Sequence, residues 1–172
     1  MSFWRHYYHF VWTTKERQPF ITPEIETPLY AYMRSKAGEL DAYIYAIGGI
    51  EEHTHIVGTV PPKHSIAWFV KTIKGSSSHF VNYVLRPERY HFAWQRGYGS
   101  LTLGHTQRPI AIEYVEKQKE HHKGFTTKGW LERTSEYDEG PDDAENPYVN
   151  GSELAMLREE KVVYDVLGIS PF

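Results

Sequence analysis

Four residues in two short stretches have the types and spacing of a metal site with a nucleophile beside it. His53 and His55 are separated by a single residue, and Tyr114 and Gln118 are four positions apart. In a strand, alternate side chains share a face, so the two imidazoles would point the same way. In a helix, residues four apart are neighbours, so Tyr114 and Gln118 would share a face. The tyrosine could act as a nucleophile, and the amide could complete a metal site with the imidazoles.

Each of these residues also has a simpler interpretation. His53 and His55 fit two ordinary histidines on a sheet face. Tyr98, between two glycines, competes with Tyr114 as the nucleophile, but no ligand type stands four residues after it. The chain contains 13 tyrosines, which either fill the core and surface or stack in part on unpaired nucleic-acid bases.

The surrounding periodicity predicts the elements that would position these residues. Alternation of side chains predicts strands, and apolar residues three and four apart predict helices. A proline in the first helical turn supports a start at Pro23, although Thr27-Pro28 is an equally good start, and Gly48-Gly49 indicates a turn or a bulge. The predicted elements are, in order, a strand at 4–12, a helix to about 40, strands at 42–47 and 53–60, a helix at 64–85, a strand ending at 103 and a helix at 109–122.

This β-α-β-β-α-β order predicts an α+β, ferredoxin-like split fold with one antiparallel sheet and helices packed on one face. The helix that carries Tyr114 is then an extra, C-terminal catalytic element. We expect a domain at 1–125 and an acidic tail at 126–172, with a short terminal helix near 153–167. That helix could dock on a second subunit or cover a basic groove.

Charge is distributed unevenly along the chain. Residues 1–125 hold 15 Lys and Arg against 11 Asp and Glu, whereas residues 126–172 hold 4 against 11. No acidic residue lies between Glu52 and Glu88, and the predicted helix in that interval places Lys71, Lys74 and Ser78 on one side. Such a face is often only solvated, but its lack of acid favours phosphate binding.

A second candidate DNA-contacting face comes from the first strand. Alternation along that strand places Arg5, Tyr7 and His9 together, opposite a more apolar set of side chains. These three residues would form a polar, aromatic face of a kind that can contact a nucleic-acid backbone or an unpaired base.

Composition excludes several classes of site. The chain has no cysteine, so disulfides, zinc–thiolate sites and cysteine nucleophiles are excluded. No apolar run approaches the roughly 20 residues of a membrane span, and the N-terminus lacks the layout of a signal peptide. We therefore expect no membrane partner and a cytoplasmic protein.

Five blocks of sequence, in order, carry a family resemblance. The chain resembles the single-tyrosine HUH transposases of small insertion sequences (IS200-like), including those associated with repetitive extragenic palindromes. One departure is Thr54, where the family has a bulky hydrophobic residue. The blocks are 8–15 (YHFVWTTK, with Arg17), 47–55 (IGGIEEHTH), 73–78 (IKGSSS), 92–99 (FAWQRGYG) and 114–122 (YVEKQKEHH).

The resemblance implies a role for each candidate residue. His53, His55 and Gln118 would bind a divalent metal, Mg²⁺ or Mn²⁺, and Tyr114 would form a covalent 5′-phosphotyrosine with single-stranded DNA near imperfect hairpins. It also implies a homodimer with composite active sites, in a prokaryotic cytoplasm and at the nucleoid. Two alternatives stay open: a domesticated protein that binds or processes hairpin DNA without transposing, and a generic ferredoxin-like metal-binding protein.

Overall fold

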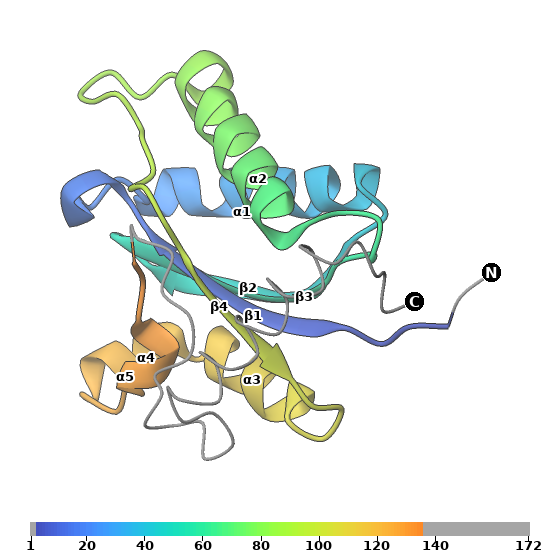
Figure 1. The fold of residues 1–172 in the computed structure, drawn as a ribbon. Helices are drawn as coiled ribbons and strands as arrows, with labels where there is room; N and C mark the ends of the chain where they lie inside the picture. Colours follow the sequence, from blue (N-terminus) through green and yellow to red (C-terminus); the bar gives the residue numbers. More distant parts are fainter. Residues whose placement is uncertain (1–2, 136–172) are drawn as a thin grey trace, which may run out of the picture. The chain divides into compact units, whose positions relative to one another are not determined.

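A four-stranded antiparallel sheet forms the centre of the computed structural model, which describes residues 3–135 (Figure 1). The spatial order is β2-β3-β1-β4, and every pair of neighbours is antiparallel. This order confirms the predicted ferredoxin-like topology, because the second strand of the chain lies at an edge of the sheet and pairs with the third strand, which separates it from the first. The strands are β1 Tyr7–Thr13, β2 Tyr43–Ile50, β3 His53–Thr59 and β4 Gly99–Leu103.

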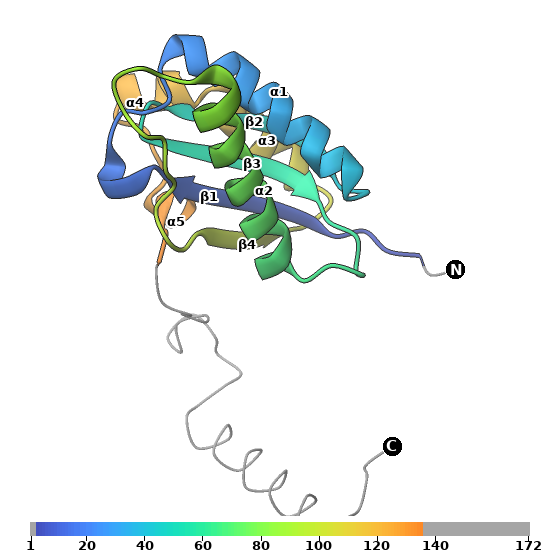
Figure 2. The same cartoon turned by 90° about the horizontal axis from the view of Figure 1, so that it is seen from above.

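Two helices cover one face of the sheet and lie side by side in Figure 2. Helix α1, Pro23–Glu39, starts at the first of the two predicted positions and keeps Pro28 in its interior. Helix α2, Ile66–Phe80, is capped by Ser65, whose hydroxyl accepts a hydrogen bond from the amide of Trp68. One π-helical turn, Val81–Leu85, continues it. The larger hydrophobic core lies between these helices and the sheet.

Three further helices cover the opposite face of the sheet (Figure 1). They are α3 Arg108–Glu116, α4 Gln118–Lys123 and α5 Gly129–Glu132. A second, smaller core between α3 and the sheet contains Ala46, Val57, Ala111 and Val115. The helix predicted as an extra element therefore covers the second face of the sheet, and β1 and β3 are buried on both faces.

Gly48 and Gly49, expected as a turn or bulge, lie inside β2 instead. A Cβ atom at Gly48 would lie 2.3 Å from the carbonyl oxygen of Val115, and one at Gly49 would lie 2.1 Å from that of His53. The two glycines therefore permit the close approach of α3 to β2 and of β3 to β2. The turn between the strands is formed by Glu51 and Glu52.

The predicted helix at 109–122 is interrupted at one residue. Lys117, with φ −98° and ψ 17°, separates α3 from α4, and neither proline nor glycine stands at the break. None of the described helices is long and apolar enough to cross a membrane.

The folded part continues past residue 125. Residues 126–135 contain α5 and a β-bridge from Tyr98 to Ser135. The chain divides into units 1–137 and 138–172, and only the first contains described residues. The helix expected near 153–167 lies outside the described residues.

Candidate active site

The two candidate metal-binding histidines lie side by side on β3. His53 and His55 alternate with Thr54, point toward the helices α3 to α5, and are 2% and 0% exposed. Their ring centroids are 5.0 Å apart. Thr54 points away from them and donates a hydrogen bond to the carbonyl of Gly48. A threonine in place of the family's bulky hydrophobic residue therefore leaves the imidazoles undisturbed.

His9 joins this imidazole pair instead of an exposed DNA-contacting face. The side chain is 0% exposed, and its Nε2 lies 3.0 Å from Nδ1 of His55. The physical reason is that the helices α3 to α5 cover the second face of the sheet. They bury the side of β1 on which the alternation of side chains had predicted an exposed polar face. Arg5 stays exposed and Tyr7 is partly exposed.

The structure brings Tyr114 to the histidines of the same chain, whereas Gln118 lines a pocket with Gly48 and Gly49. Tyr114, at the end of α3, is 5% exposed, and its ring centroid lies 6.1 Å from that of His55. On its other side, the ring stacks on His121 at 4.8 Å. Gln118, at the start of α4, is 1% exposed, and its Oε1 accepts no hydrogen bond from the described residues.

Tyr98, the competing nucleophile, lies elsewhere. It packs against the larger hydrophobic core, on the side of α1 and α2, and it lines a groove with Lys71 and Lys74. The structure therefore places Tyr114, and not Tyr98, beside the imidazoles.

The sequence analysis did not identify Glu132, which lies at the centre of this site. Its Oε1 accepts a hydrogen bond of 2.6 Å from the Tyr114 hydroxyl. Its Oε2 lies 3.0 Å from Nε2 of His55 and 3.4 Å from Nε2 of His53. No local signal marked this residue, because it follows the last family-like block by ten positions and sits in a four-residue helix.

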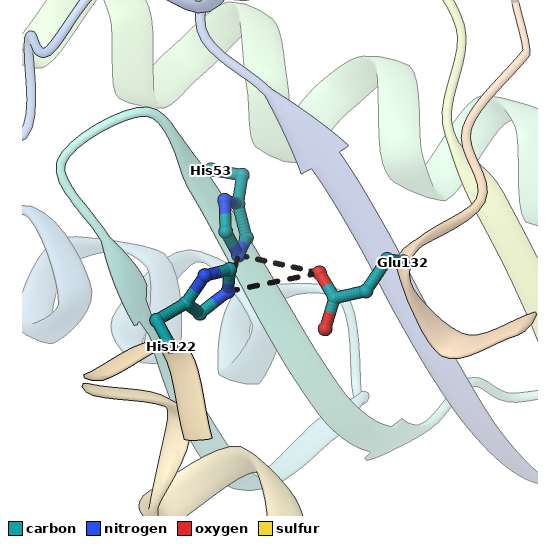
Figure 3. A group of neighbouring side chains, drawn as sticks. All are labelled: His53, His122 and Glu132. Atoms are coloured by element: carbon teal, nitrogen blue, oxygen red, sulfur yellow. Dashed lines mark hydrogen bonds and ion pairs between the residues drawn. The ribbon is translucent and has the colours of Figure 1, made fainter. Parts of the chain in front are cut away.

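His122 completes the group drawn in Figure 3. Its Nε2 lies 3.2 Å from Nε2 of His53 and 4.0 Å from Oε2 of Glu132. One donor atom from each of these three residues falls within 4.8 Å of the others, which suits shared binding of a cation. Figure 3 shows the three side chains converging from β3, α4 and α5.

Burial sets the protonation states in the site. Burial, with repulsion from His55, lowers the pKa of His53 to about 4 and that of His9 to about 3. Both imidazoles are therefore neutral at pH 7, the form that binds metals. Burial and the hydrogen bond donated to Glu132 raise the pKa of Tyr114 above its ordinary value. The phenol is therefore protonated and needs activation before it can attack.

Glu132 is ionised despite its partly buried position. Burial by itself raises the pKa of this carboxyl, but the hydrogen bond and charge of His55 and the hydrogen bond from Tyr114 outweigh it and lower the pKa to about 2. The site thus combines imidazole nitrogens with one ionised carboxylate. These donors fit a divalent ion such as Mg²⁺ or Mn²⁺.

The predicted basic face of α2 borders the groove of about 460 Å³ that Tyr98 lines, together with Trp94 and Arg96. Lys71 is exposed there. Lys74 instead donates hydrogen bonds to the carbonyls of Gln95, at 2.7 Å, and Gly97, and Ser78 donates one of 3.1 Å to the carbonyl of Phe92. These two side chains therefore also hold the 92–97 segment against the helix.

Comparison with known proteins agrees with this geometry. A family model described as "Transposase IS200 like" matches residues 2–118. A solved structure of a candidate transposase from Deinococcus radiodurans R1 is 25% identical, with a TM-score of 0.53, over 69% of this chain and 95% of that chain.

A second solved structure, of a REP-associated tyrosine transposase bound to a REP hairpin, is 15% identical and shows the same fold, with a TM-score of 0.53 over 74% of this chain and 76% of that chain. No curated protein sequence matches the chain. The family match spans the strands that carry the histidines and reaches the tyrosine and the glutamine. The chain belongs to the IS200-like transposase family.

Proposed function

We propose that this transposase cleaves and rejoins single-stranded DNA through a covalent bond to Tyr114. The observation that supports the proposal is the position of the Tyr114 phenol, beside His55 and in the same buried site as His53. A phenol and two imidazoles, with the Gln118 amide oxygen as the third proposed ligand, form a set suited to metal-assisted attack on a phosphodiester.

The proposed cleavage step conserves the energy of the phosphodiester. A bond forms between the Tyr114 oxygen and phosphorus, and the bond from phosphorus to the 3′ oxygen breaks. The phenolic proton leaves, and the 3′ oxygen takes up a proton to become a free 3′-OH. Because the 5′-phosphotyrosine is itself a diester, a 3′-OH can reverse the attack and rejoin DNA without ATP.

His53, His55 and Gln118 would hold the divalent ion, Mg²⁺ or Mn²⁺. When bound, such an ion withdraws charge from the scissile phosphate and orients it. The residues of the chain provide the rest: α3 presents the nucleophile, and the buried imidazoles and amide exclude bulk water from its surroundings.

Hairpin DNA is the proposed substrate, because one neighbour in fold is bound to a REP hairpin. Lys71, Arg5 and Tyr7 would contact its backbone or a flanking base, since all three keep exposed surface. Lys74 and Ser78 border the same groove as Lys71, and they would contact phosphates while holding the 92–97 segment.

Incubation with single-stranded hairpin oligonucleotides and Mn²⁺ tests the proposal. We expect a denaturation-resistant protein–DNA adduct that Tyr114→Phe abolishes and that the matched control Tyr98→Phe retains. Hairpin binding by the wild-type protein without any adduct would favour the alternative, a domesticated protein that binds hairpin DNA without transposing.

A homodimer with composite sites remains a prediction from the family resemblance, and the proximity of Tyr114 to His55 in one chain supports a site within each subunit. Mixing Tyr114→Phe with a His53→Ala, His55→Ala double variant separates the two arrangements. Recovery of the adduct in the mixture requires a site shared between subunits, and no recovery supports sites within single chains.

A further inference from the structure

The two carboxylate oxygens of Glu132 contact two different kinds of group. Oε1 accepts the hydrogen bond from Tyr114 at 2.6 Å, while Oε2 faces the Nε2 atoms of His55 and His53 at 3.0 and 3.4 Å. A single side chain thus connects the nucleophile with the nitrogen atoms that would bind the ion.

The backbone around Glu132 is held on both sides. The Lys128 amide donates to the Tyr114 hydroxyl at 3.1 Å, and Leu131 is buried at 3% exposure. After Glu132, the carbonyl of Arg133 lies so close to β4 that a Cβ at Gly99 would approach it to 2.2 Å. The carboxylate therefore belongs to the folded site and does not come from a surface loop.

The spacing of the donor atoms fits binding to one ion. Ligand atoms about 2.1 Å from an octahedral ion lie about 3 Å apart at adjacent positions. The distances from Oε2 of Glu132 to His55 and His53, and the 3.2 Å between the Nε2 atoms of His53 and His122, are close to that value.

Charge favours the same conclusion. The ligand set implied by the family resemblance, two imidazoles and one amide, contains no negatively charged side chain to compensate a divalent ion. Mg²⁺ and Mn²⁺ sites in proteins are usually built with at least one carboxylate. Among the described residues, Glu132 is the carboxylate that faces the Nε2 atoms of His53 and His55, whereas Glu52 lies 3.7 Å from the other ring nitrogen of His53.

We propose that Glu132 is an additional ligand of the metal site through Oε2 and holds the Tyr114 hydroxyl beside the ion through Oε1. This inference rests on the metal-dependent function proposed above. Glu132 would thus fix the position of the Tyr114 hydroxyl relative to the ion. This residue lies beyond residues 2–118, the stretch that the family model matches.

The contrary interpretation is that Glu132 only blocks the metal site. A ligand role predicts that removal of the Glu132 charge weakens Mn²⁺ binding, whereas a blocking role predicts unchanged or tighter binding. Titration calorimetry and electron paramagnetic resonance of Mn²⁺ on the full-length protein measure that affinity without DNA. We expect Glu132→Gln to bind Mn²⁺ at least about tenfold more weakly than wild type. Unchanged or tighter binding by this variant, or no Mn²⁺ binding by the wild-type protein, overturns the inference.

Two further variants control for charge and folding. Glu120→Gln removes an exposed carboxylate from the neighbouring α4 and should leave Mn²⁺ affinity unchanged. Glu132→Asp keeps the charge but shortens the side chain, so it should also bind weakly; wild-type affinity would mean that charge alone attracts the ion. Circular dichroism verifies that each variant is folded.

The adduct assay then separates ligation from positioning and from the proposed function. If Glu132 also positions Tyr114, the rate of adduct formation by Glu132→Gln stays low at saturating Mn²⁺; full recovery overturns the positioning role. If the wild-type protein forms no adduct while Glu132→Gln still weakens Mn²⁺ binding, the proposed function fails and the ligand assignment stands.

Discussion

The Nε2 atom of His9 lies 3.0 Å from Nδ1 of His55, so a residue of the first strand fixes the ring of a candidate metal ligand. When Nε2 of His55 binds a metal, its Nδ1 must carry the proton and donate it to a hydrogen bond. The low pKa of His9 keeps its ring neutral, and His9 Nε2 is the acceptor in position when the ring proton is on Nδ1.

Substitution of His9 should therefore weaken metal binding without removing a ligand. We expect His9→Ala to lower Mn²⁺ affinity by about ten- to a hundredfold, as loss of a ligand's hydrogen-bond partner typically does. Calorimetry measures the affinity, and ¹⁵N shifts of the His55 ring report its tautomer. His6→Ala, at an exposed position three residues earlier, is the control. An unchanged affinity and tautomer in His9→Ala would mean that His9 only fills space.

Gly48→Ala should separate α3 from the sheet. The added Cβ would meet the Val115 carbonyl at 2.3 Å, next to Tyr114 in the chain, so either β2 or α3 must shift. We expect the free energy of unfolding in urea to fall by about 1–3 kcal/mol and the rate of adduct formation to fall with it. Gly38→Ala, in α1 with nothing within 4 Å of its added Cβ, is the matched control and should stabilise by about 0.4–1 kcal/mol. Equal stability of the two variants contradicts the close packing of α3.

Lys71 is the clearest test of DNA binding by α2, because its ammonium is exposed and the groove lies beside it. Lys71→Gln should weaken single-strand binding and reduce the slope of log affinity against log salt by about 0.7, the loss of one phosphate contact. Charge reversal at Lys71 and Lys74 should weaken binding further. Lys36→Gln, which removes a lysine from α1, should leave the slope unchanged. Wild-type salt dependence in the Lys71 variants would exclude this face.

Lys74 should give the protein a measurable pH response. Burial lowers its pKa from the ordinary 10.5 to about 8. Between those two values the unfolded chain binds more protons than the folded chain, so the contribution of Lys74 to the free energy of unfolding rises with pH. Compared with Lys74→Arg, which stays charged, the wild-type protein should gain stability from about pH 8 upward, measured by urea unfolding. Parallel pH profiles would show that Lys74 has its ordinary pKa.

The sequence was sufficient for the order of elements and for the face shared by His53 and His55, which depends on alternation along β3. The meeting of Tyr114 with these histidines is a tertiary contact, and only the family resemblance implied it. His9 was misplaced for the same reason, since alternation shows that two faces differ but not whether a second layer covers one of them.

Glu132 and the break at Lys117 could not be predicted because neither depends on a local pattern. The position of Glu132 depends on contacts of α5 with Tyr114 and β4, which follow from the tertiary fold. Lys117 is an ordinary helix former, so its non-helical backbone reflects the packing of two short helices against the sheet.

The break at Lys117 has a mechanical consequence for the proposed mechanism, in which Tyr114 becomes attached to DNA. Tyr114 and Gln118 lie on separate rigid segments joined by the backbone torsions of one residue. The torsions of Lys117 therefore set the position of Tyr114 relative to Gln118. An unbroken helix would force both side chains to move as one body.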